Sequence, residues 1–294
     1  MLRVIVIGCG RVGTTLAMTL LSLEHDVLCG LTPRPDSPSA GQFRISTGRD
    51  VFELTTGEAI RQAEHADAIF ITTPDRAVTE TAQTLCDSGM VHTGQMVIHT
   101  SGSLGSDALC AVKEYGAMTL SLHPLQTIAT ATAGKAVLDG IYCTLEGDAA
   151  AVEVGINLVR SWGGIPLEIS PALRPQYHAA AVLASNAVVA LAAVAAEVSG
   201  LTEGLAALLP LMRGAVNNLE TLGLPAALTG PIERGDLRTV QAHVKALEYN
   251  PTAKSVYAAL GSATANLAVA KGTLSPAQRQ QFTDLFSDKV NKES

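Results

Sequence analysis

The sequence has little basic charge and no long run of lysine or arginine. Lys and Arg number 20 against 27 Asp and Glu, and the formal net charge is −7 with an isoelectric point of about 5.5. Nucleic acids and anionic membranes attract basic patches, which this chain does not offer. We therefore expect a small-molecule substrate as partner, with no nucleic acid and no membrane.

Metal-binding and hydrolase motifs are also missing. The sequence has no H-E-x-x-H, no C-x-x-C pair and no G-x-S-x-G elbow, so we expect no metal and no serine-hydrolase chemistry. An odd number of scattered cysteines predicts buried free thiols in a reducing cytoplasm. They are Cys9, Cys29, Cys86, Cys110 and Cys143.

No segment is predicted to export the chain or to cross a membrane. Only a short apolar strand with an early Arg3 precedes the first glycine, which is too short for a signal-peptide core, so we expect a cytoplasmic protein. The stretch Ala179–Ala196 approaches spanning length, but Ser185 and Asn186 lie at its centre and no aromatic or basic flanks are present. We expect it to form a buried helix.

A glycine-rich turn follows the first apolar run, Leu2–Ile7. Gly8, Gly10 and Gly13 form G-x-G-x-x-G with Cys9, Arg11 and Val12 between them, before a helix expected to begin near Thr14. Such a turn lets the backbone approach a pyrophosphate, and the helix N-terminus offers it unpaired N–H groups. We predict a dinucleotide site made by Gly8, Gly10, Arg11, Val12 and Gly13.

The second predicted strand, 26–31, indicates which dinucleotide binds. NAD-binding proteins end this strand with an acidic residue that holds the ribose, whereas here Thr32, Pro33 and Arg34 follow. The guanidinium fork of Arg34 suits a 2′-phosphate, so we expect NADP(H) with Thr32 and Arg34 in its site. The alternative is that Arg34 is a solvated loop cation.

The order of elements predicts an α/β fold. Short apolar runs alternate with helix-like stretches up to about residue 165, which is typical of a doubly wound parallel Rossmann sheet. Ligands lie beyond the carboxyl ends of such strands, which adds Thr73, Pro74, Ser101 and His123 as candidates. The runs are 2–7, 27–31, 51–54, 68–73, 96–100, 118–122 and 140–145.

The remainder of the chain predicts an all-α domain, so we expect domains at residues 1–165 and 166–294. Its apolar faces are too wide for an isolated bundle, and we expect a homodimer that buries these helices. A capping box at Thr55 and Glu58 predicts a further helix in the first domain. Helices of the second domain are predicted at 175–199, 202–222, 236–248, 252–271 and 276–290, with Asp236 and Ser275 as caps.

Three polar residues interrupt the predicted helix at 175–199. His178 is a candidate general acid for carbonyl or imine reduction, because histidine is the side chain best suited to exchange a proton near neutral pH. Ser185 and Asn186 would orient the substrate or the carboxamide. His123, beside Pro124 at a strand end, is the rival acid. Structural roles for both histidines and for Asn186 remain open alternatives.

These motifs resemble a known family. The N-terminal half is similar to the six-phosphogluconate dehydrogenase superfamily, near ketopantoate reductase, pyrroline-5-carboxylate reductase and prephenate dehydrogenase. Residues 121–126, Tyr177–Ala180 with Ser185 and Asn186, and 229–236 resemble Rossmann-like proteins whose C-terminal domain has no known function. The resemblance implies an NADP-dependent oxidoreductase that dimerises through helices.

One residue departs from the superfamily pattern. Many members carry a lysine four residues before the asparagine, and Val182 stands there, so the resemblance does not identify the acid. The leading expectation is an NADPH-dependent reductase of a small 2-oxo acid, with ketopantoate as the first substrate to try. The alternatives are an imine reductase, a prephenate-like dehydrogenase, or a non-catalytic sensor of NADP(H).

Overall fold

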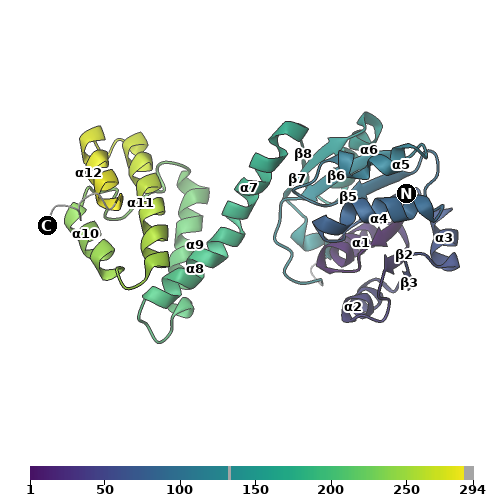
Figure 1. Cartoon of the computed structure of the whole chain (residues 1–294), viewed down its shortest axis with the longest axis horizontal. Coiled ribbons are helices and arrows are strands. Elements are labelled where there is room, and N and C mark those ends of the chain that lie inside the picture. The colour runs from purple at the N-terminus through teal and green to yellow at the C-terminus, as the bar shows by residue number, and fades with distance from the viewer. Residues whose placement is uncertain (132–133, 288–294) are drawn as a thin grey trace. The chain divides into compact units, whose positions relative to one another are not determined.

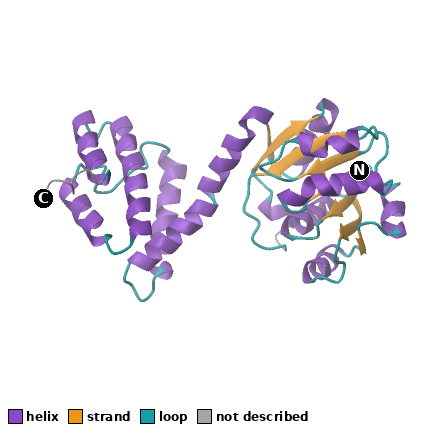
Figure 2. Cartoon of the chain, viewed as in Figure 1, coloured by secondary structure: helices purple, strands orange, loops and turns teal. Residues whose placement is uncertain are grey.

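The computed structural model describes residues 1–131 and 134–287 (Figure 1). The chain divides into two compact units, Met1–Val182 and Leu183–Ser294. The first unit contains the strands that the structure describes, and the second contains helices (Figure 2). The predicted α/β fold with a helical C-terminal part is therefore confirmed.

The strands described in the first unit form one eight-stranded sheet in the order β3-β2-β1-β4-β5-β6-β7-β8. The strand order reverses at β1, with β2 on one side and β4 on the other, as in doubly wound sheets. The strands are β1 (Arg3–Ile7), β2 (Asp26–Thr32), β3 (Val51–Glu53), β4 (Ala68–Ile71), β5 (Met96–His99), β6 (Met118–Pro124), β7 (Tyr142–Gly147) and β8 (Ile165–Glu168).

The sheet is parallel except at one pair. β7 runs antiparallel to β6, so the prediction of a wholly parallel sheet was wrong at this point. β8 is parallel to β7 and was missed. Its residues are mostly exposed and include Pro166, and a proline within a short run argues against a strand.

Helices pack on both faces of the sheet. Alternate residues of β1 belong to two different cores, because Val4 and Val6 lie in one and Ile5 and Ile7 in the other. The helices of the first unit are α1 (Arg11–Ser22), α2 (Pro38–Thr47), α3 (Gly57–Ala63), α4 (Asp75–Asp87), α5 (Cys110–Lys113) and α6 (Ala149–Ser161), with α7 (Arg174–Ala184) beginning in it.

Two helix starts differ from the sequence prediction. α1 begins at Arg11 rather than near Thr14, directly after the glycine turn. α3 is capped by Thr56, whose hydroxyl accepts from the N–H of Ala59 at 3.3 Å, and not by Thr55. Glu58 accepts instead from Gln62 one turn ahead at 3.0 Å, so it stabilises the exposed face of the helix.

The predicted helix at 175–199 is interrupted. α7 ends at Ala184, Ser185 has φ −126° and ψ −77°, and α8 begins at Asn186. Serine and asparagine favour helix caps over helix interiors, which explains a break at this pair. The described helices that follow are α8 (Asn186–Val198), α9 (Leu205–Leu222), α10 (Leu237–Ala246), α11 (Pro251–Lys271) and α12 (Pro276–Phe286).

The predicted caps of the second unit are confirmed. The Asp236 carboxylate accepts from the N–H of Thr239 at 3.1 Å, and Ser275 with Gln278 forms a capping box at the start of α12. The last predicted helix extended to residue 290, and the part beyond residue 287 lies outside the described residues.

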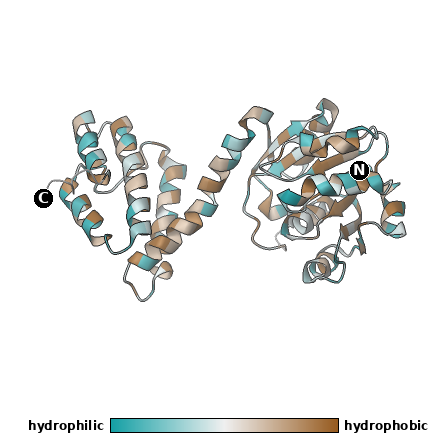
Figure 3. Cartoon of the chain, in the orientation of Figure 1, coloured by the Kyte–Doolittle hydropathy of each residue, from teal (hydrophilic) through white to brown (hydrophobic). Residues whose placement is uncertain are grey.

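The apolar stretch Ala179–Ala196 is not buried within the chain, so that prediction was wrong. α8 and α9 contain no buried residue in this structure, and apolar residues are distributed along both helices (Figure 3). Leu183, Val189 and Leu211 are 69%, 72% and 72% exposed. The described residues include one helical segment, Pro171–Val198, that is long and apolar enough to cross a membrane by composition alone.

The cysteines are free thiols, and four of the five are buried. Burial raises the pKa of Cys9 to about 12, which keeps this thiol protonated and unreactive. Cys110 is exposed, contrary to the prediction of buried thiols, because it lies on the one-turn helix α5 at the surface.

Candidate active site at the carboxyl edge of the sheet

The glycine turn has the geometry that its spacing predicts. Gly8 has φ +96°, which side chains rarely adopt, and its N–H donates to the carbonyl of Leu31 at 2.8 Å. A Cβ on Gly13 would lie 2.2 Å from the Gly8 carbonyl oxygen, so only glycine lets α1 pack this closely on β1. A Cβ on Gly10 would meet nothing within 4 Å. The backbone is therefore open at Gly10, the N-cap of α1.

The start of α1 has the character of an anion site. The first N–H groups of a helix have no acceptor within it, and Gly10 provides no side chain to cap them. Arg11 is exposed and Val12 is half-buried at the following positions. These residues fit the pyrophosphate of a dinucleotide.

A threonine fastens the glycine turn to the neighbouring strand. The Thr72 hydroxyl, just after β4, lies 2.7 Å from the Gly8 carbonyl oxygen and 3.0 Å from that of Ile7, to which it donates. Thr73 follows with a buried hydroxyl that has no partner, and Pro74 is the exposed N-cap of α4. Both predicted residues thus lie at the same edge as the glycines.

Arg34 lies in the loop that follows β2, and hydrogen bonds hold this loop in place. The N–H of Arg34 donates to the Thr32 hydroxyl at 3.4 Å, and Arg44 fixes the loop by donating to the Pro35 carbonyl at 2.8 Å. The Arg34 side chain takes part in none of the ion pairs in the described part of the chain. A carboxylate that the sequence reading missed, Glu53, ends β3 in register with Thr32.

One face of the sheet changes from apolar to polar at β5. On β1 and β4 this face carries isoleucines, whereas on β5, β6 and β7 it carries polar side chains in register, His99 beside Ser121, Ser121 beside Glu146, and His123 beside Thr144. We call these five residues the polar row. His99, Ser121 and Thr144 are fully buried. Burying so many polar groups is costly unless they are paired or used.

His123 lies at the carboxyl end of this row. Its Nδ1 is 2.8 Å from the Tyr177 hydroxyl, and the two rings meet edge to face. Burial, followed by the charges of His178 and Arg174, lowers the pKa of His123 to about 4. The imidazole is therefore neutral at neutral pH.

His178 approaches His123 across Gly102. A Cβ on Gly102 would lie 2.6 Å from His178 Nδ1 and 2.8 Å from His123 Nε2, so both nitrogens lie close to one point beside this glycine. The ring centroids are 6.3 Å apart, and His178 Nδ1 is buried without a hydrogen-bond partner. The two predicted rival acids are thus neighbours.

The loop that carries Gly102 is fastened at both ends. His99 accepts from the N–H of Ser101 at 3.2 Å through Nδ1, and its Nε2 lies 2.9 Å from the Gly105 carbonyl, to which it donates. The Glu146 carboxylate accepts from the N–H of Ser106 at 2.8 Å and from its hydroxyl at 2.6 Å. The Ser101 hydroxyl accepts from the N–H of Ser103 and of Leu104, each at 3.2 Å, so it supports the turn.

Arg174 joins α7 to this loop and was missed as a site residue. It is 2% exposed, and its Nη2 donates to Glu146 Oε2 at 3.3 Å. Arg174, Tyr177 and His178 are spaced i, i+3 and i+4, which places them on one face of α7. That spacing was visible in the sequence, but nothing local shows that Arg174 is buried or that Glu146 lies opposite it.

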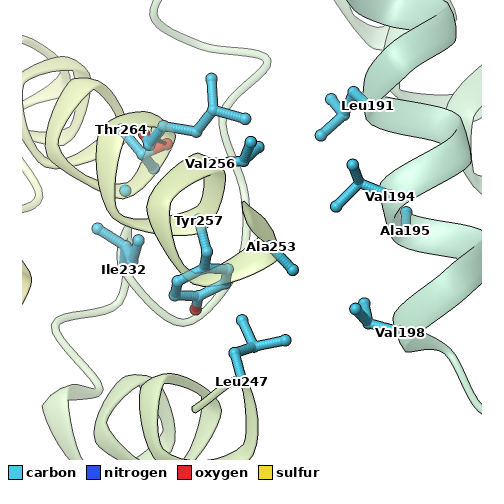
Figure 4. A pocket seen from close by; sticks show the side chains of 12 residues that line it. Leu191, Val194, Ala195, Val198, Ile232, Leu247, Ala253, Val256, Tyr257 and Thr264 are labelled. Carbon is cyan, nitrogen blue, oxygen red and sulfur yellow. Dashed lines mark hydrogen bonds between the residues drawn. The ribbon is translucent and has the colours of Figure 1, made fainter. Parts of the chain in front are cut away.

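Ser185 and Asn186 belong to the second unit. They begin α8, and the Ser185 hydroxyl donates to Asn186 Oδ1 at 3.0 Å. The second unit also holds an apolar pocket of about 320 Å³ between α8 and α11. Figure 4 shows Leu191 and Val194 on one side of it and Val256 and Tyr257 on the other. Tyr257 and Thr264 are the residues with polar side chains in this lining.

Within the described residues, no group of three or more His, Cys, Asp and Glu side chains lies close enough together to hold a metal ion.

Comparisons with known proteins agree with this architecture. Residues 1–124 match the Rossmann-like domain family, and residues 141–264 match DUF2520, a domain of unknown function. No curated protein matches the sequence.

Solved structures share the fold over nearly the whole chain. Protein TM1727 from Thermotoga maritima is 22% identical with a TM-score of 0.71, covering 92% of this chain and 99% of its own. BF3122 from Bacteroides fragilis, a candidate NADP oxidoreductase, is 19% identical with a TM-score of 0.74 and covers 90% and 98%. An imine reductase from Pseudomonas sp. is 18% identical with a TM-score of 0.61 and covers 97% and 98%. Family models thus match the chain in two successive parts, a Rossmann-like domain at residues 1–124 and DUF2520 at residues 141–264.

Proposed function

We propose that this protein is an NADPH-dependent oxidoreductase that reduces the carbonyl group of a small 2-oxo acid. The observation that carries the proposal is the convergence of His178 Nδ1 and His123 Nε2 beside Gly102. These nitrogens lie at the carboxyl edge that also holds the glycine turn. The proposed proton donor and the proposed dinucleotide site would therefore share one edge of the sheet.

Successive residues along this edge of the sheet would contact successive parts of the dinucleotide. The N–H groups at Gly10, Arg11 and Val12 would hold the pyrophosphate, and Arg34 at the end of β2 would hold a 2′-phosphate. In the other direction, β6 lies three strands from β1, or roughly 14 Å at the usual strand spacing. The nicotinamide half would extend along this distance past Thr73 and Ser101.

His178 is the proposed proton donor. NADPH bound at this edge would supply the hydride to the carbonyl carbon. His178 Nδ1 has no protein partner, so it is available to give its proton to the carbonyl oxygen. His123 stays neutral, as its pKa of about 4 requires, and would orient the carbonyl.

A second candidate function is imine reduction. The shared fold with the Pseudomonas imine reductase favours it at the level of architecture alone. The same histidines would then serve a C=N bond, and the two functions differ in which class of substrate turns over.

We further propose that the chain acts as a homodimer in the cytoplasm, joined through its C-terminal helices. The exposed leucines and valines of α8 and α9 support a helical interface, because contiguous apolar surface of this kind marks association sites.

The proposed function is tested by following NADPH absorbance with a panel of 2-oxo acids that includes ketopantoate, and with cyclic imines. Turnover of an oxo acid supports the proposal, and turnover of imines alone supports the second candidate. The variant His178→Gln should lose turnover by roughly a hundredfold or more and keep NADPH affinity. NADPH uptake with a flat trace across the whole panel would reject both and leave a sensor of the cofactor.

A further inference from the structure

Unpaired buried polar atoms are concentrated around His123. Of seven such side-chain atoms in the described residues, three belong to Arg174 and His178. His178 is the ring neighbour of His123, and the charge of Arg174 acts on the His123 ring. Buried polar groups in folded proteins are nearly always paired, so this concentration points to an acceptor that joins them on binding.

Arg174 has the most hydrogen-bonding capacity in this group. A guanidinium carries five N–H donors, yet only Nη2 has an acceptor, and Nε and Nη1 are buried without one. Its acceptor, Glu146, divides its oxygens between Arg174 and the N–H and hydroxyl of Ser106. Nε and Nη1 of Arg174 therefore retain three N–H donors for a second anion.

Arg174 lies near the two histidines of the proposed chemistry. It lies one helical turn before His178, on the same face of α7. Burial is the main cause that lowers the pKa of His123, and the charges of His178 and then of Arg174 lower it further. An anion at Arg174 would thus lie beside both imidazoles.

We propose that Arg174 binds the carboxylate of the substrate and so selects 2-oxo acids over neutral ketones and cyclic imines. This inference rests on the proposed function, since it names the substrate class of the same site. Arg174 is 2% exposed, so the carboxylate reaches it only by displacing the side chains that cover it. Once there it is held away from water, where charge-assisted hydrogen bonds are strong.

The test is calorimetric titration of the full chain, saturated with NADP⁺, with oxamate and with oxamide. Oxamate is an unreactive analogue of a 2-oxo acid, and oxamide is its neutral counterpart. Oxamate should bind and oxamide should bind at least tenfold more weakly, by the usual strength of charged hydrogen bonds. Arg174→Lys should weaken the binding of oxamate by roughly ten- to a hundredfold and leave the affinity for NADP⁺ unchanged.

Glu146→Gln is the matched control. It removes the carboxylate that competes for Arg174 and keeps an oxygen for Ser106, so oxamate affinity should be retained or increased. If Arg174 only fastens α7 through Glu146, both variants should lose oxamate binding to the same extent, which would overturn the proposal. Equal binding of oxamate and oxamide to the wild-type chain would overturn it as well.

These outcomes remain decisive if Arg174→Lys does not fold, because the wild-type and Glu146→Gln titrations do not need it. Failure of the wild-type chain to take up NADP⁺ would instead contradict the proposed function. Oxamate can then be titrated without nucleotide, so the two failures are distinguishable.

Discussion

The hydroxyl of Tyr177 lies 2.8 Å from Nδ1 of His123, and this contact joins the first turns of α7 to the end of β6. With Nδ1 engaged, Nε2 is the nitrogen that faces Gly102 and His178. The contact fixes the ring plane as well as its position, since the rings meet at 84°. Tyr177 was not among the predicted site residues, yet it orients His123, which was.

His123 should make the protein less stable in acid. Its pKa is lowered to about 4, chiefly by burial, whereas the unfolded chain takes up this proton near pH 6.5. Stability present above about pH 6.5 is therefore lost as the pH falls through about 4, by an amount on the order of 3 kcal/mol. Urea unfolding at about pH 7 and about pH 4.5 measures the difference.

The variant His123→Gln should lose much of this pH dependence. A remainder should persist, because burial also lowers the pKa of His99 and of His25. An unchanged dependence in the variant would show that His123 is not held neutral by the fold.

Gly13→Ala should destabilise the first unit. Its Cβ would lie 2.2 Å from the Gly8 carbonyl oxygen and 2.5 Å from Thr72 Oγ1, so the turn or the helix must shift. Overpacking of this kind costs about 1–3 kcal/mol, which thermal unfolding detects as a lower Tm.

Gly10→Ala is the control for that prediction. A Cβ there meets nothing within 4 Å, so the Tm should stay near the wild-type value. Its NADPH affinity should fall, because the added methyl obstructs the approach of the pyrophosphate. Equal losses of Tm in both variants would contradict this explanation of the two glycines.

Arg34→Ala should weaken NADPH binding by roughly ten- to a hundredfold, the value of one charge-assisted contact, and leave NADH binding nearly unchanged. Arg49→Ala is the control, since Arg49 pairs with Asp26 at the start of β2, 3.2 Å away. Equal affinities of Arg34→Ala and wild type for both coenzymes would instead favour Glu53, at the end of β3, as the group that holds the ribose.

The α8–α9 surface should carry the dimer contact. Val189→Glu and Leu211→Glu each place a charge where the wild-type side chain is 72% exposed. Burying that charge in an interface is costly, so light scattering should show dissociation of the dimer. Ile45→Glu, at a site 81% exposed on α2, should leave the mass unchanged. A monomeric wild-type chain would rule out the proposed homodimer.

Local signals predicted most of the fold. The glycine turn, the buried strands and the caps at Asp236 and Ser275 each depend on a few consecutive residues, so the sequence alone was sufficient. The reversal at β7 and the missed strand β8 depend on pairing between distant segments. No local periodicity reports such pairing.

The candidate site was predicted only in part. His123 and His178 were identified because they interrupt apolar segments. Their proximity, and the roles of Arg174 and Glu146, arise from contacts between residues 28 and more positions apart. Arg174 on α7 is buried against the carboxylate of Glu146 on β7. The residues next to Arg174 in the sequence do not reveal this partner.

The proposed chemistry requires that a dinucleotide binds where β1 meets α1. Calorimetric titration of the purified, nucleotide-free chain with NADPH tests it most directly. NADPH should show saturable uptake that Arg34→Ala weakens and Arg49→Ala does not. Heats indistinguishable from dilution, with NADPH and with NADH alike, would contradict it.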